Sequence, residues 1–159
     1  MRIRREKGFS LIELLIVVAI ILIIAAIAIP NLLKSKMAAN ESSAVGSMRT
    51  INTAQVTYAA SCPNIGYSAS LAELNTGAIC AGGTGIIDNV LSTGTKSGYT
   101  FTYTPGAAAA NGVVSTYTNV AVPLNVGVTG QRGFFSDQSG VIRYSLSGAA
   151  PTNASSALQ

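Results

Sequence analysis

Few side chains in this sequence of 159 residues could carry out chemistry. There is no histidine, and beyond residue 34 the acidic side chains are only Glu41, Glu73, Asp88 and Asp137. A general acid–base pair, an activated nucleophile or a cluster of carboxylate ligands is hard to build from so small a set. The sequence therefore predicts that the chain is not an enzyme and that it holds no metal and no cofactor.

The two cysteines, Cys62 and Cys80, lie in a region rich in serine, threonine and glycine. Such a pair suits an oxidising compartment, where one disulfide closing a loop of this length would add about 3 kcal/mol of stability. We therefore expect a disulfide between Cys62 and Cys80. Two unpaired buried thiols are the alternative, whereas an isolated cysteine pair makes a poor metal site.

A long apolar segment dominates the first third of the chain. Leu14 to Ile29 is an unbroken apolar run, and with its apolar flanks it reaches the length of about 20 residues that a helix needs to cross a bilayer. By the positive-inside rule the N-terminus lies in the cytoplasm, because the basic residues before the run are Arg2, Arg4, Arg5 and Lys7. The remainder of the chain is then exported.

The basic character of the chain comes largely from that N-terminal segment. The formal net charge is +4, but without residues 1–8 six basic and five acidic side chains remain. In the exported part, Lys96, Arg132 and Arg143 are too few to form the basic stripe that nucleic acid requires. Nucleic acid is therefore not an expected partner.

Glu13 stands near the start of the apolar segment. A carboxylate at the centre of a bilayer costs roughly 2.5 to 3.5 kcal/mol, and less near the interface, so this side chain needs a partner. The alternative is that it extends to the lipid headgroups. An ordinary secretory signal does not account for the pattern, because the apolar run is long and leads directly into an amphipathic segment.

The start of the apolar segment carries a short motif, Lys7-Gly8-Phe9-Ser10-Leu11-Ile12-Glu13-Leu14-Leu15, and a second match follows at Ala25-Ala26-Ile27-Ala28-Ile29-Pro30. Together they closely resemble the processing signal of the type IV prepilin family. The resemblance implies that prepilin peptidase, a membrane aspartyl peptidase, cuts between Gly8 and Phe9, removes residues 1–8 and methylates the new amine of Phe9. A residue without Cβ suits a tight protease cleft, which gives Gly8 a physical role.

The same resemblance names a partner for Glu13. It implies that this carboxylate pairs with the terminal amine of Phe9 in a neighbouring subunit, so that copies of the chain stack into an open helical filament. Apolar packing of the helices would supply most of the stability, because buried ion pairs seldom add much. The implied partners are further copies of the chain, prepilin peptidase, the pilus assembly machinery of the inner membrane and, before assembly, membrane lipid.

An apolar stripe with helical spacing continues beyond Pro30 and consists of Leu33, Met37, Val45, Met48, Ile51, Val56 and Ala59. One helix over residues 9–60 is the simplest interpretation, with a transmembrane and polymerising part at 9–31 and an amphipathic part at 32–60. Pro30 removes one helix hydrogen bond and is expected to kink the helix. Many members of the family have glycine in place of Leu22, and we expect less unwinding here.

Residues 61–159 are predicted to form a globular head with a loop region at 61–97, a β-sheet at 98–146 and a C-terminal tail at 147–159. The tail is a poor candidate for a core because it holds mainly small and polar residues. Ser70 to Glu73 has the form of a capping box that starts a short helix.

Alternation of aromatic residues with threonines from Tyr99 to Thr104 is typical of a strand. Further strands are predicted at 114–122, 133–136 and 141–145, the last two joined by a turn at 137–140. The predicted fold class is α+β, with a long N-terminal helix packed on a small antiparallel sheet of about four strands. This is the type IV pilin fold that the resemblance implies.

The resemblance further implies a structural subunit of a type IV pilus that serves adhesion, surface attachment or twitching motility. The precursor would lie in the inner membrane and the assembled filament outside the cell. A type II secretion pseudopilin is one alternative, although the acid-poor segment 137–141 lacks the carboxylates of a calcium site. A minor or DNA-uptake pilin and a single-span anchored binding domain that never polymerises also stay open.

The tail offers two candidate modification sites. Asn153-Ala154-Ser155 fits the glycosylation sequon, which makes Asn153 and Ser155 candidate glycosylation sites.

Overall fold

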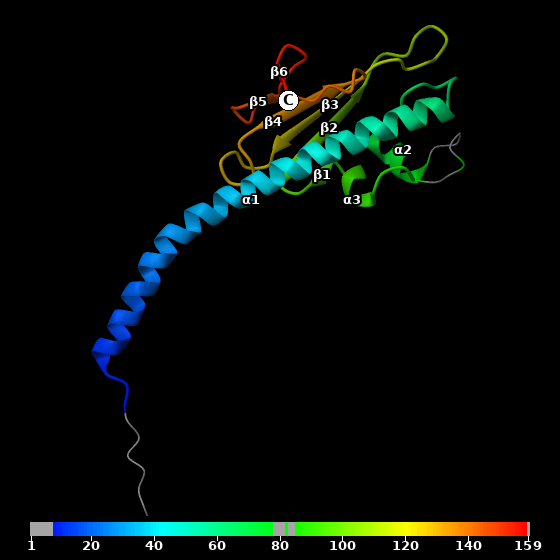
Figure 1. The fold of residues 1–159 in the computed structure, drawn as a ribbon. Coiled ribbons are helices and arrows are strands. Elements are labelled where there is room, and N and C mark those ends of the chain that lie inside the picture. Colours follow the sequence, from blue (N-terminus) through cyan, green and yellow to red (C-terminus); the bar gives the residue numbers. More distant parts are fainter. Residues whose placement is uncertain (1–7, 78–81, 83–84, 159) are drawn as a thin grey trace, which may run out of the picture. The chain divides into compact units, whose positions relative to one another are not determined.

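The computed structural model describes residues 8–77, 82 and 85–158 (Figure 1). In these ranges the helices are α1 (Leu11–Ser61), α2 (Leu71–Thr76) and α3 (Asn89–Ser92). The strands are β1 (Thr95–Lys96), β2 (Tyr99–Pro105), β3 (Tyr117–Pro123), β4 (Gly133–Asp137), β5 (Arg143–Ser145) and β6 (Ser156–Ala157). The chain divides between two compact units, one ending at Ser35 and the other beginning at Lys36, so α1 contributes to both.

In the first unit α1 is built mainly from aliphatic residues and contains no glycine. The large apolar side chains from Phe9 to Leu33 are 45–79% exposed, so nothing in this unit covers them. By length and composition α1 is the one helix of the described residues that could cross a membrane, with a mean hydropathy of 3.3 over its most apolar window. The helix continues through Pro30 without interruption, and the kink expected there stays a prediction.

In the second unit the strands form a single antiparallel sheet in the order β1-β2-β3-β4-β5-β6. Each strand pairs with its neighbour in the sequence, so the sheet is a meander. Within β2, Tyr99 and Phe101 are buried and Tyr103 is half-buried, whereas the intervening threonines are more exposed. This confirms the predicted alternation and the α+β class.

The predicted number of strands is wrong, because the described sheet has six rather than about four. The two missed strands, β1 and β6, are two residues long and carry no apolar alternation that a sequence pattern could reveal. β1 forms because Ser97 and Gly98 both adopt positive φ, 51° and 75°, in the tight turn to β2. β6 forms in the predicted tail, where Tyr144 pairs with Ser156 and Leu158 packs against the core.

Local turn chemistry agrees with the other predictions for the head. Ser70 caps α2 and its hydroxyl accepts a hydrogen bond from Glu73 N at 3.3 Å. Gly140 N donates to Asp137 O at 2.9 Å and closes the turn between β4 and β5.

The strand predicted from Val114 begins three residues too early. Val114 lies outside β3 and instead forms isolated bridges with Gly66 and Ala108.

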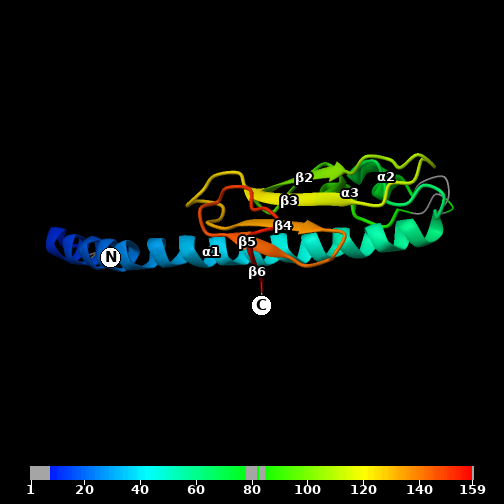
Figure 2. The same cartoon turned by 90° about the horizontal axis from the view of Figure 1, so that it is seen from above.

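The core of the head lies between the second half of α1 and the sheet, which run alongside each other (Figure 2). The helix contributes the buried residues Ala44, Met48, Ile51, Ala54 and Tyr58. The predicted apolar stripe is therefore only partly correct: Met48 and Ile51 are buried, but Val56 is 60% exposed. Alanine and polar residues occupy much of the buried face, and a hydropathy pattern does not identify them.

Buried and half-buried polar side chains join α1 to the rest of the head in what we call the polar seam, made of Asn52, Gln55, Ser68, Tyr103, Tyr117 and Ser136. Asn52 Nδ2 donates to Ser136 Oγ at 2.8 Å, and Asn52 Oδ1 accepts from the Tyr117 hydroxyl at 3.2 Å. Gln55 Nε2 donates to Ser68 Oγ at 2.8 Å, and Gln55 Oε1 accepts from Ser68 N at 3.1 Å. Both amides therefore use their donor and their acceptor inside the core.

Candidate functional site

The residues predicted to be cut and methylated lie just before α1. Gly8, Phe9 and Ser10 are all exposed and none belongs to a helix or strand. A Cβ added to Gly8 would have no neighbouring atom within 4 Å, and the φ of Gly8 is not in the left-handed region. Neither packing nor backbone conformation in the described chain requires glycine at this position. A requirement imposed by a second protein, such as the cleft of a peptidase, agrees with this geometry.

Glu13 has a partner within its own chain. Ser10 N donates a hydrogen bond to Glu13 Oε2 at 2.9 Å, and Leu14 N donates to Ser10 O at 3.2 Å as α1 begins. A carboxylate three residues into a helix that accepts from the residue before the first turn forms one half of a capping box. It also places negative charge beside the helix N-terminus, where the backbone dipole favours it.

This capping contact was not predicted, although the sequence carries its signal. Serine at position 10 and glutamate at position 13 have the spacing of a capping box, and the same spacing at Ser70 and Glu73 did predict the start of α2. Only one oxygen of Glu13 is used, because no described residue donates a hydrogen bond to Oε1. That oxygen is available for a second cation or donor.

The surroundings of Glu13 favour such a second partner. It is the only charged residue between Gly8 and Lys34, and the helix around it exposes large aliphatic side chains. A carboxylate on an apolar surface binds a cationic group strongly once that surface is covered, because the local dielectric constant falls. The arrangement can therefore align a neighbouring ammonium group against the first turn of α1, and it fits a membrane-anchored precursor.

The remaining predicted site residues lie in the head. Cys62 follows α1 directly and is only 2% exposed, whereas Cys80 lies outside the described residues, so the disulfide stays a prediction. Asn153 is exposed in the turn that precedes β6. Ser155 is half-buried, and its hydroxyl accepts a hydrogen bond from Thr152 N at 3.0 Å. Glycosylation of this turn also stays a prediction.

Comparison with known proteins finds similarity in the N-terminal segment. A family model described as the prokaryotic N-terminal methylation motif matches residues 3–29. The type IV major pilin protein PilA of Myxococcus xanthus is 50% identical over 54 residues, which are 34% of this chain and 24% of that protein. The type IV wide pilus major component PilA4 of Thermus thermophilus is 63% identical over 38 residues, which are 24% of this chain and 29% of that protein.

The chain thus spans about a quarter of the length of these curated relatives. No solved structure gives a significant match. The matched segment holds the features described above: Gly8 without a structural constraint, Phe9 at the predicted new N-terminus, and Glu13 at the start of an apolar helix. Over its N-terminal segment the chain therefore carries a prokaryotic N-terminal methylation motif and is similar to two type IV major pilins.

Proposed function

We propose that the chain is a structural subunit of a type IV pilus that is cut between Gly8 and Phe9, methylated at Phe9 and polymerised through α1. The observation that carries the proposal is the apolar part of α1, which holds Glu13 as its only charge and runs without a break into the helix of the head. The assembled filament lies outside the cell and serves adhesion, surface attachment or twitching motility.

The exposed apolar surface of α1 explains why the subunit has two environments. Burying a large aliphatic side chain contributes about 1.5 to 3 kcal/mol, so a helix with more than a dozen such exposed side chains needs a covering. Lipid of the inner membrane covers it in the precursor. In the filament the same surface packs against copies of α1, and the ammonium group of Phe9 in one subunit meets Glu13 Oε1 in the next.

The first test is the mass and the N-terminal sequence of the mature protein from surface filaments. The proposal expects a chain that begins with N-methylated Phe9 and retains all of α1. A chain that begins after Pro30 would mean that the apolar segment is a discarded signal. A chain that retains residues 1–8 in filaments would mean that cleavage is not part of assembly.

The second test separates the two contacts of Glu13. Glu13→Gln keeps a side-chain oxygen that can accept from Ser10 N but removes the charge, whereas Glu13→Ala removes both. Both variants are expected to remain in the membrane fraction and to form no filaments visible by electron microscopy. Asp88→Asn is the matched control, because it removes one carboxylate charge from an exposed position in the head and is expected to leave filaments unchanged.

If Glu13→Gln forms filaments as well as the wild-type chain, capping of α1 is the whole role of Glu13 and the proposed pairing with Phe9 is wrong. If the wild-type chain itself stays in the membrane and never assembles, the chain is an anchored binding domain instead.

A further inference from the structure

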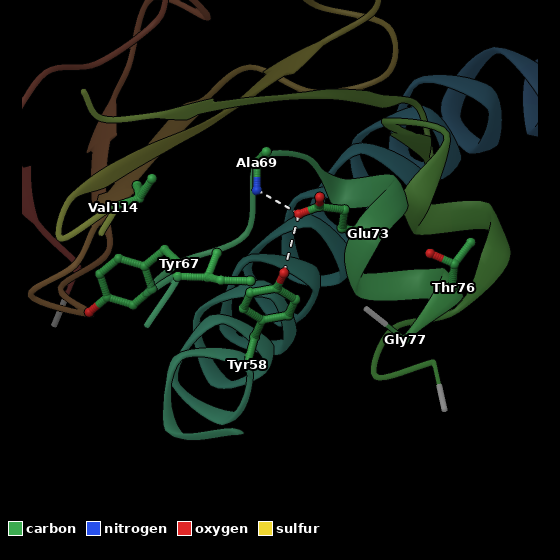
Figure 3. A pocket seen from close by; sticks show the side chains of 8 residues that line it. Tyr58, Tyr67, Ala69, Glu73, Thr76, Gly77 and Val114 are labelled. Atoms are coloured by element: carbon green, nitrogen blue, oxygen red, sulfur yellow. Dashed lines mark hydrogen bonds between the residues drawn. The ribbon is translucent and has the colours of Figure 1, made fainter. Parts of the chain in front are cut away.

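A cavity of about 400 Å³ opens where the chain leaves the C-terminal end of α1 (Figure 3). Its lining includes Tyr58 from α1, Ile65 and Tyr67 from the following loop, Glu73 from α2, and Val114. This volume lies in the range of pockets that hold small organic molecules. The cavity lies wholly in the head and is separate from the N-terminal assembly segment.

The wall formed by residues 65–67 and 114 is held in place by backbone hydrogen bonds. Tyr67 N donates to Val114 O at 2.9 Å, and Val114 N donates to Ile65 O at 2.8 Å. The ring of Tyr67 also packs edge-on against the ring of Tyr117, with centroids 4.8 Å apart. A ligand would therefore meet a largely preformed wall and would not need to order it on binding.

Glu73 is the only charged residue among the described side chains that line the cavity. Its Oε2 accepts a hydrogen bond from Ala69 N at 2.7 Å and a longer one from the Tyr58 hydroxyl at 3.5 Å (Figure 3). No described residue donates to Oε1. Burial and the negative charge of Glu73 both raise the pKa of Tyr58, so Tyr58 stays protonated and donates to the carboxylate at neutral pH.

One acceptor thus remains for a donor that enters the cavity, Oε1 of the half-buried Glu73, because the Tyr58 side chain is fully buried. Beside this oxygen, Ile65, Tyr67 and Val114 provide apolar surface. An anion would be repelled by Glu73, and a neutral apolar molecule would leave the carboxylate without a counter-ion. The complementary ligand is a cation with an apolar body.

We propose that this cavity binds the protonated primary amine of an alkylammonium group. The ammonium nitrogen donates to Oε1 of Glu73, and the alkyl chain lies along Ile65, Tyr67 and Val114. The group belongs either to a free alkylamine or to a lysine side chain of a peptide. The proposal goes beyond assembly of the subunit and does not depend on it.

The test uses the full-length chain in a non-ionic detergent, with carbon-13 labels on the methyl groups of isoleucine and valine. Pentylamine and 1-pentanol have chains of the same length and differ in charge. Pentylamine is expected to shift the Ile65 and Val114 methyl signals in a saturable manner, with a dissociation constant of about 1 mM, and 1-pentanol to bind about tenfold more weakly. A second titration with Nα-acetyl-lysine methylamide decides between the two sources, since only a lysine-peptide site gains affinity from the added backbone.

Glu73→Gln retains an acceptor for Ala69 N and removes the charge, so it is expected to weaken pentylamine binding about tenfold and to leave 1-pentanol unchanged. Asp88→Asn is the control carboxylate and is expected to change neither titration. If Glu73→Gln does not fold, Ile65→Ala shortens an exposed apolar side chain of the lining, and it is expected to weaken binding of both pentylamine and 1-pentanol several-fold.

Equal binding of pentylamine and 1-pentanol would overturn the proposal. So would the absence of a saturable shift at about ten times the expected dissociation constant. Because these titrations do not require filaments, their outcome is independent of whether the subunit polymerises.

Discussion

Arg132 Nε lies 2.7 Å from Glu41 Oε2 and joins the segment between β3 and β4 to α1 across 91 residues of sequence. The other oxygen of Glu41 accepts from Gln131 N at 2.8 Å and from Arg132 N at 3.1 Å. The guanidinium also lies over the rings of Phe134 and Tyr144, with its carbon 5.7 and 5.9 Å from their centroids. Glu41 is 7% exposed, so its charge depends on these donors rather than on water.

Glu41→Gln is expected to destabilise the head by about 2 to 4 kcal/mol at neutral pH, because Arg132 loses its counter-ion and the amide cannot serve all three donors. Burial acts to raise the pKa of Glu41, but the hydrogen bonds from Gln131 and Arg132 outweigh it and hold the pKa below the usual value. This stabilisation is therefore present above the unfolded pKa of about 4.3 and is lost as the pH falls through the folded pKa.

Thermal unfolding of the full-length chain in detergent, followed by circular dichroism between neutral and acidic pH, measures both effects. Glu41→Gln should unfold at a lower temperature than the wild-type chain at neutral pH, and its unfolding temperature should fall less as the pH is lowered. Asp88→Asn is the comparison, because the ion pair between Asp88 and Lys96 is more exposed and contributes little. An equal change in both variants would show that Glu41 and Arg132 have no special role.

The buried tyrosines predict alkaline unfolding of the head. Burial raises the pKa of Tyr103 to about 12, and also raises the pKa of Tyr99 and of Tyr117. The protonated forms are favoured in the folded chain, so their contribution is present below the unfolded pKa of about 10 and is lost as the pH rises through the folded values. Tyrosinate absorbance should therefore rise at higher pH than in denaturant, together with loss of the circular dichroism signal. Coincident titration curves with and without denaturant would contradict this.

Gly46 lies in the middle of α1 in the head and is exposed, and a Cβ added there would meet nothing within 4 Å. Gly46→Ala is therefore expected to stabilise the head by about 0.5 to 1 kcal/mol, since alanine loses less backbone entropy in a helix. Gly66→Ala is the opposing case, because Gly66 has φ +81° and its Cβ would collide with the Val114 carbonyl oxygen. The temperature of half-unfolding should rise in Gly46→Ala and fall in Gly66→Ala. A lower temperature in Gly46→Ala would contradict this expectation.

The predicted disulfide between Cys62 and Cys80 gives a separate expectation. Without reductant neither cysteine should react with an alkylating reagent in denaturant, and the intact mass should be lower than that of the reduced chain by two hydrogen atoms. Reduction, or substitution of both cysteines by serine, should lower the free energy of unfolding by about 3 kcal/mol. Alkylation of both cysteines in the unreduced chain would show that this disulfide does not form.

Patterns that depend on near neighbours were predictable from the sequence. The apolar run before Pro30 predicts a long helix, the alternation from Tyr99 to Thr104 predicts β2, and Ser70 with Glu73 predicts the start of α2. Each of these signals lies within a few residues of the structure that it specifies. The motif around Gly8 is equally local, which explains why the methylation motif was recognisable although no solved structure matches the chain.

Contacts between distant residues were not predictable in the same way. Nothing in the sequence around Asn52 or Gln55 distinguishes them from solvent-facing polar residues of a helix, and their buried position depends on Ser136 and Ser68. The pairing of Glu41 with Arg132 depends on how the segment between β3 and β4 lies against α1. For Glu13, the resemblance implies a partner in another subunit, whereas the described chain supplies a partner in Ser10, only three residues distant.

The hydrogen bonds that join α1 to the head have a mechanical consequence. Glu41 is held by Gln131 and Arg132, while Asn52 and Gln55 in the polar seam are held about three and four turns further along the same helix. Sliding the helix along its own axis would stretch all of these bonds at once, so a pulling force would be shared among them. The head would then resist traction along α1 better than peeling from one end, in which the bonds would break one after another.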